Sequence, residues 1–167
     1  MKTFQYIVVA IVLLLAARPG YGADNSPQAT PNPELEGTFA KYAEAAKLFY
    51  DGKPEAVKAM WSHGDDVTLS GAAGGETARG WKNVSERLDW ASSQFSRGSK
   101  AVELIQQTVS GDFAYVVQYE HILFYPPGQT RQSKRDYRVT TIFRREPEGW
   151  RVVHRHADTL LKREAIK

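Results

Sequence analysis

The sequence contains no cysteine. Disulfide bridges, thiolate metal ligands and a cysteine nucleophile are therefore excluded, and the folded chain must be held together by the packing of its core. Two other motifs are also missing. The glycine-rich stretch 71–75 lacks the lysine and the helix start of a phosphate-binding loop, and no serine lies in a Gly-x-Ser-x-Gly turn. These absences exclude the common phosphate-loop and serine-hydrolase mechanisms.

A strong charge of one sign is absent too. The chain has 22 lysine and arginine residues against 19 aspartate and glutamate residues, a net charge of +3. Lys2 and Arg18 lie in the N-terminal segment, and without them the balance is 20 to 19, or +1. The basic residues are concentrated in 131–167, but they occur in strand-like segments without a motif of stacking aromatics. We therefore expect no nucleic-acid partner.

The one long apolar run is at the N-terminus. Residues 6–17 are all apolar, Lys2 precedes them, and small residues and helix breakers follow, which is the order of a secretory signal peptide. The run is shorter than the ~20 residues that a bilayer-spanning helix needs. We predict a signal peptide over 1–22 that is cleaved, export to the periplasm or the medium, and no stable membrane anchor after cleavage.

The remaining chain divides into three parts. Residues 23–33 are polar and proline-rich, which is typical of a disordered linker. Residues 34–162 have the length of one ordinary domain with room for a core. Residues 163–167 form a short tail.

Helical periodicity comes first in the domain. Apolar residues recur every three or four positions over 35–49 and again over 81–95, and a shorter helix is predicted over 54–61. We expect Gly98 to end the third helix, because glycine commonly follows the last helical turn.

After Gly98, apolar residues recur at every second position instead of every third or fourth. Strands are predicted over 102–109, 113–125, 131–145 and 150–160, with short turns rich in glycine and proline between them. Helices followed by antiparallel hairpins predict an α+β domain in which a curved sheet wraps the preceding helices.

The last predicted strand has unusual chemistry on one face. Regular alternation places these side chains together: Trp150, Val152, His154, His156 and Asp158. A core face needs only apolar residues, so imidazoles and a carboxylate there indicate the wall of a partly polar pocket. A bulge near the preceding turn would reverse the face.

Several interpretations of these polar groups stay open. His154 and His156 are wall residues of a pocket or a subunit interface, ligand contacts, or two metal ligands of a site that His63, His121, Glu120 or Asp158 would complete. The candidate catalytic residues are those that could shuttle a proton near neutral pH: His154, His156, Asp158 and Glu120.

The strand over 113–125 offers two different faces to a pocket. Tyr115, Tyr119 and His121 share one face, and Gln118 and Glu120 lie among apolar neighbours on the other. We favour the tyrosine face, because small-molecule sites are commonly lined by aromatic residues.

Four segments together resemble a known family: WSHGDDVTL, RGWKNVSERLDWA, GDFAYVVQYE and RVTTIFRREPEGWRVVHRHAD. In their order, over roughly residues 36–160, they are similar to the SnoaL-like and DUF4440-like branch of the nuclear transport factor two superfamily. The resemblance implies a cone-shaped roll with three N-terminal helices packed in a strongly curved, mostly antiparallel sheet. It also implies a pocket between the sheet and the helices.

Members of this superfamily range from ketosteroid isomerases and polyketide cyclases to binding modules without catalysis. Ketosteroid isomerases keep a general-base aspartate on the strand that here spans 67–71, and this segment has no carboxylate. The resemblance therefore implies a binding domain for a small apolar or mixed-polarity organic ligand, expected to form a homodimer, and the predicted signal peptide adds export. We expect neither a cofactor nor a metal.

An enzyme of the polyketide cyclase, isomerase or hydratase type is the alternative. It requires a buried histidine and a carboxylate within ~3.2 Å of each other, both facing an enclosed cavity. The candidate ligand-binding residues are Trp61, His63, Trp81, Tyr115, Tyr119, Tyr137, Trp150, His154 and His156.

Overall fold

The computed structural model describes residues 33–160, and the predicted signal peptide, nearly all of the linker and the tail lie outside them. The helices are α1 (Pro33–Phe49), α2 (Glu55–Lys58) and α3 (Trp81–Ser93). The strands are β1 (Thr68–Ser70), β2 (Ala78–Arg79), β3 (Ser96–Ser110), β4 (Phe113–Tyr125), β5 (Ser133–Glu146) and β6 (Gly149–Thr159). Among the described residues, no helix combines the length and the apolar composition needed to cross a bilayer.

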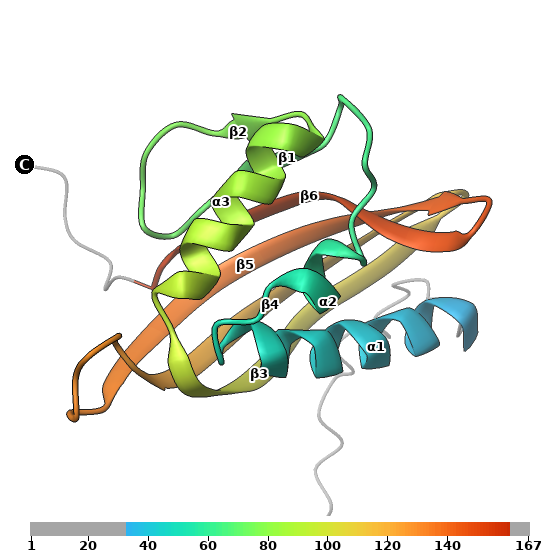
Figure 1. Ribbon diagram of the computed structural model, residues 1–167. Helices are drawn as coiled ribbons and strands as arrows, with labels where there is room; N and C mark the ends of the chain where they lie inside the picture. Colours follow the sequence, from blue (N-terminus) through green and yellow to red (C-terminus); the bar gives the residue numbers. More distant parts are fainter. Residues whose placement is uncertain (1–32, 161–167) are drawn as a thin grey trace, which may run out of the picture.

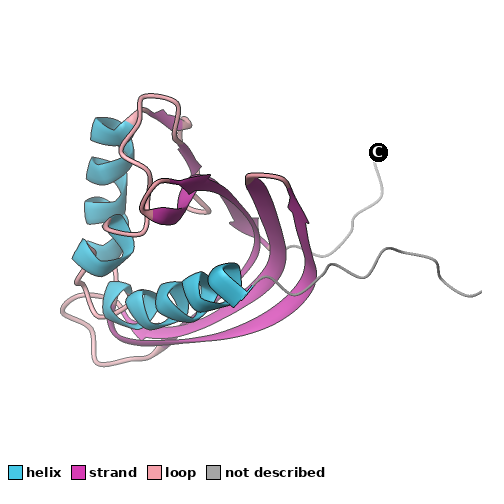
Figure 2. Cartoon of the chain, turned by 90° about the vertical axis from the view of Figure 1, so that its right-hand side faces the viewer, coloured by secondary structure: helices cyan, strands magenta, loops and turns pink. Residues whose placement is uncertain are grey.

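The strands form one six-stranded sheet in the order β2-β1-β6-β5-β4-β3. Strand β1 runs parallel to β6, and the other neighbours are antiparallel. The sheet bends strongly around the helices, which lie on its concave side (Figures 1 and 2). The predicted α+β class, with helices packed in a curved and mostly antiparallel sheet, is confirmed.

The third helix is shorter than predicted. It ends at Ser93 instead of Gly98, and the chain is already extended from Ser96 as the start of β3. Gly98 lies against the end of α1, where its N–H donates to the carbonyl oxygen of Tyr50 at 2.9 Å. The glycine therefore permits a close approach of two segments and does not cap a helix.

Two apolar clusters make up the core. The larger one packs α1 and α3 against the inner face of the sheet and includes Leu35, Trp61 and Val152. The smaller one contains Ala46, Tyr50, Ile122 and Phe124.

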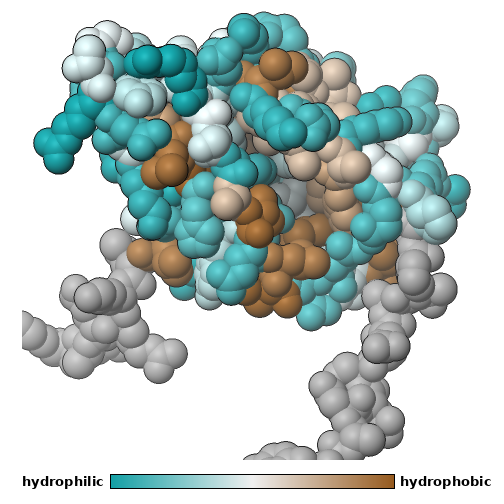
Figure 3. Space-filling model, turned by 90° about the horizontal axis from the view of Figure 1, so that it is seen from below, coloured by the Kyte–Doolittle hydropathy of each residue, from teal (hydrophilic) through white to brown (hydrophobic). Residues whose placement is uncertain are grey.

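Strand β3 forms one edge of the sheet, and its apolar residues are not all covered. Val102, Leu104 and Ile105 are each about half exposed, at 47%, 57% and 47%, and Leu48 of α1 is 46% exposed. The face of the molecule seen from below shows hydrophobic residues gathered between hydrophilic ones (Figure 3).

A β-bulge in β6 reverses the facing of its second half. Phe143 pairs with Val152 and Ile142 pairs with His154, so Val153 is the extra residue. Val152 and Val153 are consequently both buried. Beyond the bulge, Arg155 and Ala157 point inward. Without the extra residue, regular alternation from Trp150 would point the even-numbered residues inward instead.

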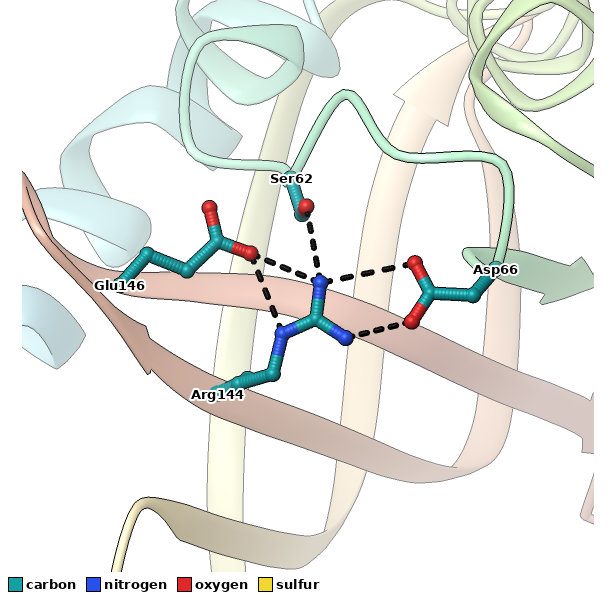
Figure 4. A network of polar contacts seen from close by, with 4 residues as sticks. All are labelled: Ser62, Asp66, Arg144 and Glu146. Atoms are coloured by element: carbon teal, nitrogen blue, oxygen red, sulfur yellow. Dashed lines mark hydrogen bonds and ion pairs between the residues drawn. The ribbon is translucent and has the colours of Figure 1, made fainter.

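A polar network fastens the segment before β1 to the β5–β6 hairpin. Arg144 donates hydrogen bonds to Asp66, to Glu146 Oε1 at 2.8 Å and to Ser62 Oγ at 3.2 Å (Figure 4). The Ser62 N–H also donates to the carbonyl oxygen of Val152 at 2.9 Å. The hydrogen bonds from Arg144 lower the pKa of Asp66. This network holds the segment directly before β1 against the hairpin.

Candidate functional site

A cavity of about 460 Å³ lies between the helices and the concave face of the sheet. Its wall is largely apolar and comprises Ala46, Phe49, Leu69, Leu88, Trp90, Ala91, Phe95, Phe124, Pro126 and Pro127. The polar side chains in the cavity include Tyr42, Tyr50, Lys100, Glu120, Tyr137 and Arg155. Volume and lining are both typical of a small-molecule site.

Glu120 of β4 is the centre of the polar groups and is only 1% exposed. Its Oε1 accepts hydrogen bonds from Gln118 at 2.7 Å and Lys100 at 3.3 Å, and its Oε2 accepts from Arg155 at 2.7 Å and Tyr50 at 3.3 Å. Burial alone would raise the pKa of Glu120. The charges of Arg155 and Lys100 and these hydrogen bonds outweigh that effect and lower the pKa to about 2. The carboxylate is therefore ionised at neutral pH.

Two cations reach this carboxylate from strands that lie on either side of β4 in the sheet. Arg155 comes from β6 and Lys100 from the edge strand β3, and their side chains are 15% and 7% exposed. Burial would lower the pKa of Arg155, but the charge of Glu120 outweighs it and raises the pKa, so the guanidinium stays protonated. The ammonium of Lys100 also lies 5.8 Å from the ring centroid of Tyr42.

Three tyrosines surround the ion cluster as neutral donors. Burial is the main reason that the pKa of Tyr42, of Tyr50 and of Tyr137 is raised. Their hydroxyl groups therefore stay protonated at neutral pH, and each can donate a hydrogen bond or accept one.

The rim of the cavity includes the loop between β1 and β2. Gly71, Ala72 and Ala73 line the cavity. Arg87 of α3 holds this loop by donating to the carbonyl oxygens of Gly74 at 3.1 Å and Glu76 at 3.2 Å.

The expected facing of the last strand is corrected by the structure. His154, His156 and Asp158 lie on the face opposite Arg155, because the extra residue Val153 shifts the alternation. His154 Nδ1 hydrogen-bonds to the hydroxyl of Thr68 at 2.7 Å. Asp158 forms an ion pair with Arg138. The pKa of His154 is lowered, mainly by partial burial and to a smaller extent by the charge of the nearby His156.

The favoured face of β4 is corrected in the same way. Glu120 and Gln118 lie on the concave face, and Tyr115 and Tyr119 lie on the opposite one, where Tyr115 is 40% exposed. The convex face also carries His121, whose Nδ1 lies 2.6 Å from Asp136 Oδ1. This histidine–carboxylate pair therefore faces away from the cavity.

The candidate aromatic residues divide between core and surface. Trp61 and Trp150 are buried in the large core cluster. His63 stacks on Trp81 with ring centroids 4.0 Å apart, outside the cavity lining. Of the predicted site residues, the cavity contains Glu120 and Tyr137.

Sequence reasoning missed Lys100, Arg155, Tyr42 and Tyr50. The alternation that places His154 and His156 on the pocket face places Arg155 on the opposite face. One signal was present: a carboxylate on an apolar strand face, as at Glu120, requires a cationic partner when it is buried. No spacing in the sequence identifies which cation that is.

The described part of the chain holds no group of potential metal ligands. Among residues 33–160, no three histidine, aspartate or glutamate side chains are arranged to hold a metal ion. His154 and His156 have no third potential ligand within this part of the chain.

A strongly curved, mostly antiparallel sheet around helices is the arrangement of the α+β proteins with a cystatin-like fold. The model of the SnoaL-like domain family matches residues 37–160, and the chain belongs to this family. The comparison with curated proteins gave no match.

Solved structures share the fold at low sequence identity. A candidate dehydratase of the NTF2-like family from Streptomyces avermitilis is 20% identical with a TM-score of 0.65, over 77% of this chain and 96% of that chain. A ketosteroid isomerase-like protein from Erwinia carotovora atroseptica is 20% identical with a TM-score of 0.63, over 78% and 99%. A nuclear transport factor 2-like superfamily protein from Salmonella enterica serovar Typhimurium is 18% identical with a TM-score of 0.63, over 77% and 90%. At these identities the likeness supports the fold alone.

Proposed function

We propose that the domain binds a small organic molecule of mixed polarity in the cavity between α1, α3 and the sheet. The observation that carries this function is the coexistence of a mostly apolar wall with one buried polar cluster around Glu120. An apolar wall contributes affinity by excluding water, and a few fixed polar groups orient the ligand. Export and self-association stay predictions from the sequence and the family resemblance.

Catalysis by a histidine–carboxylate shuttle has less support than binding. SnoaL-like domains occur with ligand binding and with isomerase- or hydratase-type activity, and the solved relatives include a dehydratase candidate and an isomerase-like protein. In this chain His154 and His156 face away from the cavity. Glu120, with a pKa of about 2, is a weak proton acceptor at neutral pH. We therefore favour binding.

Filling the cavity should weaken ligand binding without unfolding the domain. Ala91 of α3 lines the cavity, so Ala91→Phe places a ring in the space that a ligand would occupy. With the neutral fluorescent probe N-phenyl-1-naphthylamine, we expect the dissociation constant of this variant to rise at least about tenfold, equivalent to about 1.4 kcal/mol. Fluorescence titration measures the effect.

The matched control is Ser93→Phe, which adds the same ring to an exposed position of the same helix. Its dissociation constant should stay within about twofold of the wild-type value, because surface substitutions change little. Equal binding by wild type, Ala91→Phe and Ser93→Phe would contradict binding in this cavity.

A further inference from the structure

The charges that line the cavity are predominantly positive. Arg87, Lys100, Arg135 and Arg155 line it together with one carboxylate, Glu120, which gives four positive charges against one negative charge, or +3. Across residues 33–160, 17 lysine and arginine residues are balanced by 17 aspartate and glutamate residues. The lining of the cavity is therefore more positive than the described part of the chain as a whole.

The positive charge at the rim is not neutralised by other carboxylates. Within residues 33–160, Arg87 bonds to the neutral carbonyl groups of Gly74 and Glu76, and Arg135 bonds to the carbonyl oxygen of Lys134. Neither arginine forms an ion pair with a carboxylate in this part of the chain. Among the described residues that line the cavity, Glu120 is the single carboxylate, and it pairs with Lys100 and Arg155 only.

The two buried cations retain hydrogen-bonding capacity. The guanidinium of Arg155 has five N–H donors, and its partners are Glu120 and Tyr42. The ammonium of Lys100 has three donors, and its hydrogen-bond partner is Glu120. A cation removed from water is stabilised by each further charge-assisted hydrogen bond. Both side chains are therefore suited to a second anion.

A cationic ligand is disfavoured by the same arrangement. Both oxygens of Glu120 already accept two hydrogen bonds each, from Gln118, Lys100, Tyr50 and Arg155. A ligand ammonium would have to displace one of these donors and would meet the excess positive charge.

We propose that the cavity selects an organic anion with an aromatic body, which deepens the proposed binding function and rests on it. The acid group contacts Lys100 and Arg155, and the aromatic body packs against Trp90, Phe95 and Phe124. The planar fork of the guanidinium matches a carboxylate or sulfonate in a bidentate geometry. The aromatic wall accommodates the ring by edge or stacked contacts.

The test compares two fluorescent probes that share one skeleton. 1-Anilinonaphthalene-8-sulfonate carries a sulfonate, and N-phenyl-1-naphthylamine lacks it. The wild-type domain should bind the sulfonate probe at least about tenfold more tightly at low salt. Lys100→Met should weaken binding of the sulfonate probe about tenfold and leave the neutral probe within about twofold.

One control variant and one replacement variant accompany this comparison. Lys82→Met removes an exposed lysine of α3 that pairs with Glu86, and both probes should bind to it as to wild type. If Lys100→Met does not fold, as judged by circular dichroism, Arg135→Met at the cavity rim replaces it. This substitution should weaken binding of the sulfonate probe selectively.

The outcomes distinguish the selection of an anion from ligand binding in the cavity as such. Equal affinities for both probes, with both lost in Ala91→Phe, would overturn selection of an anion and leave the binding function intact. A sulfonate probe that binds equally well to Ala91→Phe, while the neutral probe does not bind at all, would overturn both. Preference for the sulfonate probe that depends on Lys100 and is lost in Ala91→Phe supports both.

Discussion

Replacing Glu120 by leucine is expected to lower the free energy of unfolding by about 3–5 kcal/mol, because it removes the only carboxylate between two buried cations. Lys100 and Arg155 both reach Glu120, at 3.3 and 2.7 Å, and their side chains are almost fully covered. Without the carboxylate these two like charges would stay desolvated beside each other. Urea denaturation at pH 7 measures the loss.

Two further variants identify the cause of this loss. Glu103→Leu removes an exposed carboxylate from β3, where the side chain is 63% exposed, and should change stability by no more than about 0.5 kcal/mol. The triple variant Glu120→Leu, Lys100→Met and Arg155→Met replaces the whole ion cluster by apolar side chains and should recover most of the stability. A Glu120→Leu protein as stable as wild type, or a triple variant that recovers nothing, would refute the assignment to unpaired charge.

The same carboxylate should make stability depend on acid pH. The pKa of Glu120 is lowered from 4.5 to about 2 in the folded chain, so the unfolded chain takes up this proton first as the pH falls. The stability that Glu120 contributes is complete above about pH 4.5 and is lost as the pH falls toward 2. Denaturation curves of wild type and Glu120→Gln should therefore converge over this interval. A stability difference that stays constant from pH 6 to pH 2.5 would argue against an ionised, paired Glu120.

Gly98→Ala is the second substitution for which we expect a large loss, about 1–3 kcal/mol of unfolding free energy. A Cβ atom at this position would lie 2.5 Å from the carbonyl oxygen of Tyr50 and 2.7 Å from its Cβ atom. Both neighbours are close to or part of the backbone, so α1 and β3 would have to move apart. Thermal and urea denaturation measure the loss.

Gly37→Ala is the matched control for this glycine. Gly37 lies within α1, and an added Cβ atom there would meet nothing within 4 Å. Alanine is the better helix former by about 0.5–1 kcal/mol, so this substitution should stabilise the domain. If both substitutions raise the melting temperature, Gly98 is not held in a close backbone contact.

The secondary structure could be predicted because it depends on local patterns. The three- and four-residue spacing over α1 and the long alternating segments of β4, β5 and β6 gave the order of elements and the α+β class. The predicted end of a helix was wrong where a tertiary contact outweighed the local sequence pattern. Gly98 has the position of a helix end in the sequence, but in the structure it packs against Tyr50 within the first residues of β3.

The candidate site was predictable only in part. Glu120 was a candidate because a carboxylate on an otherwise apolar strand face needs an explanation, and the structure places it at the centre of the cavity. Lys100 and Arg155, its partners, are 20 and 35 residues away along the chain. Contacts over such separations depend on strand order and register, which alternation does not encode.

The sequence by itself determined that helices precede hairpins, that the core must hold without cross-links and that polar groups lie on otherwise apolar strand faces. Only the tertiary structure decided which of these groups meet inside the cavity. The reason is a single extra residue: Val153 forms a bulge in β6, and beyond it Arg155 points inward while His154 and His156 point outward. Because strand alternation has a period of two, one inserted residue reverses the side chains that follow it in β6, and Arg155 reaches Glu120 through that reversal.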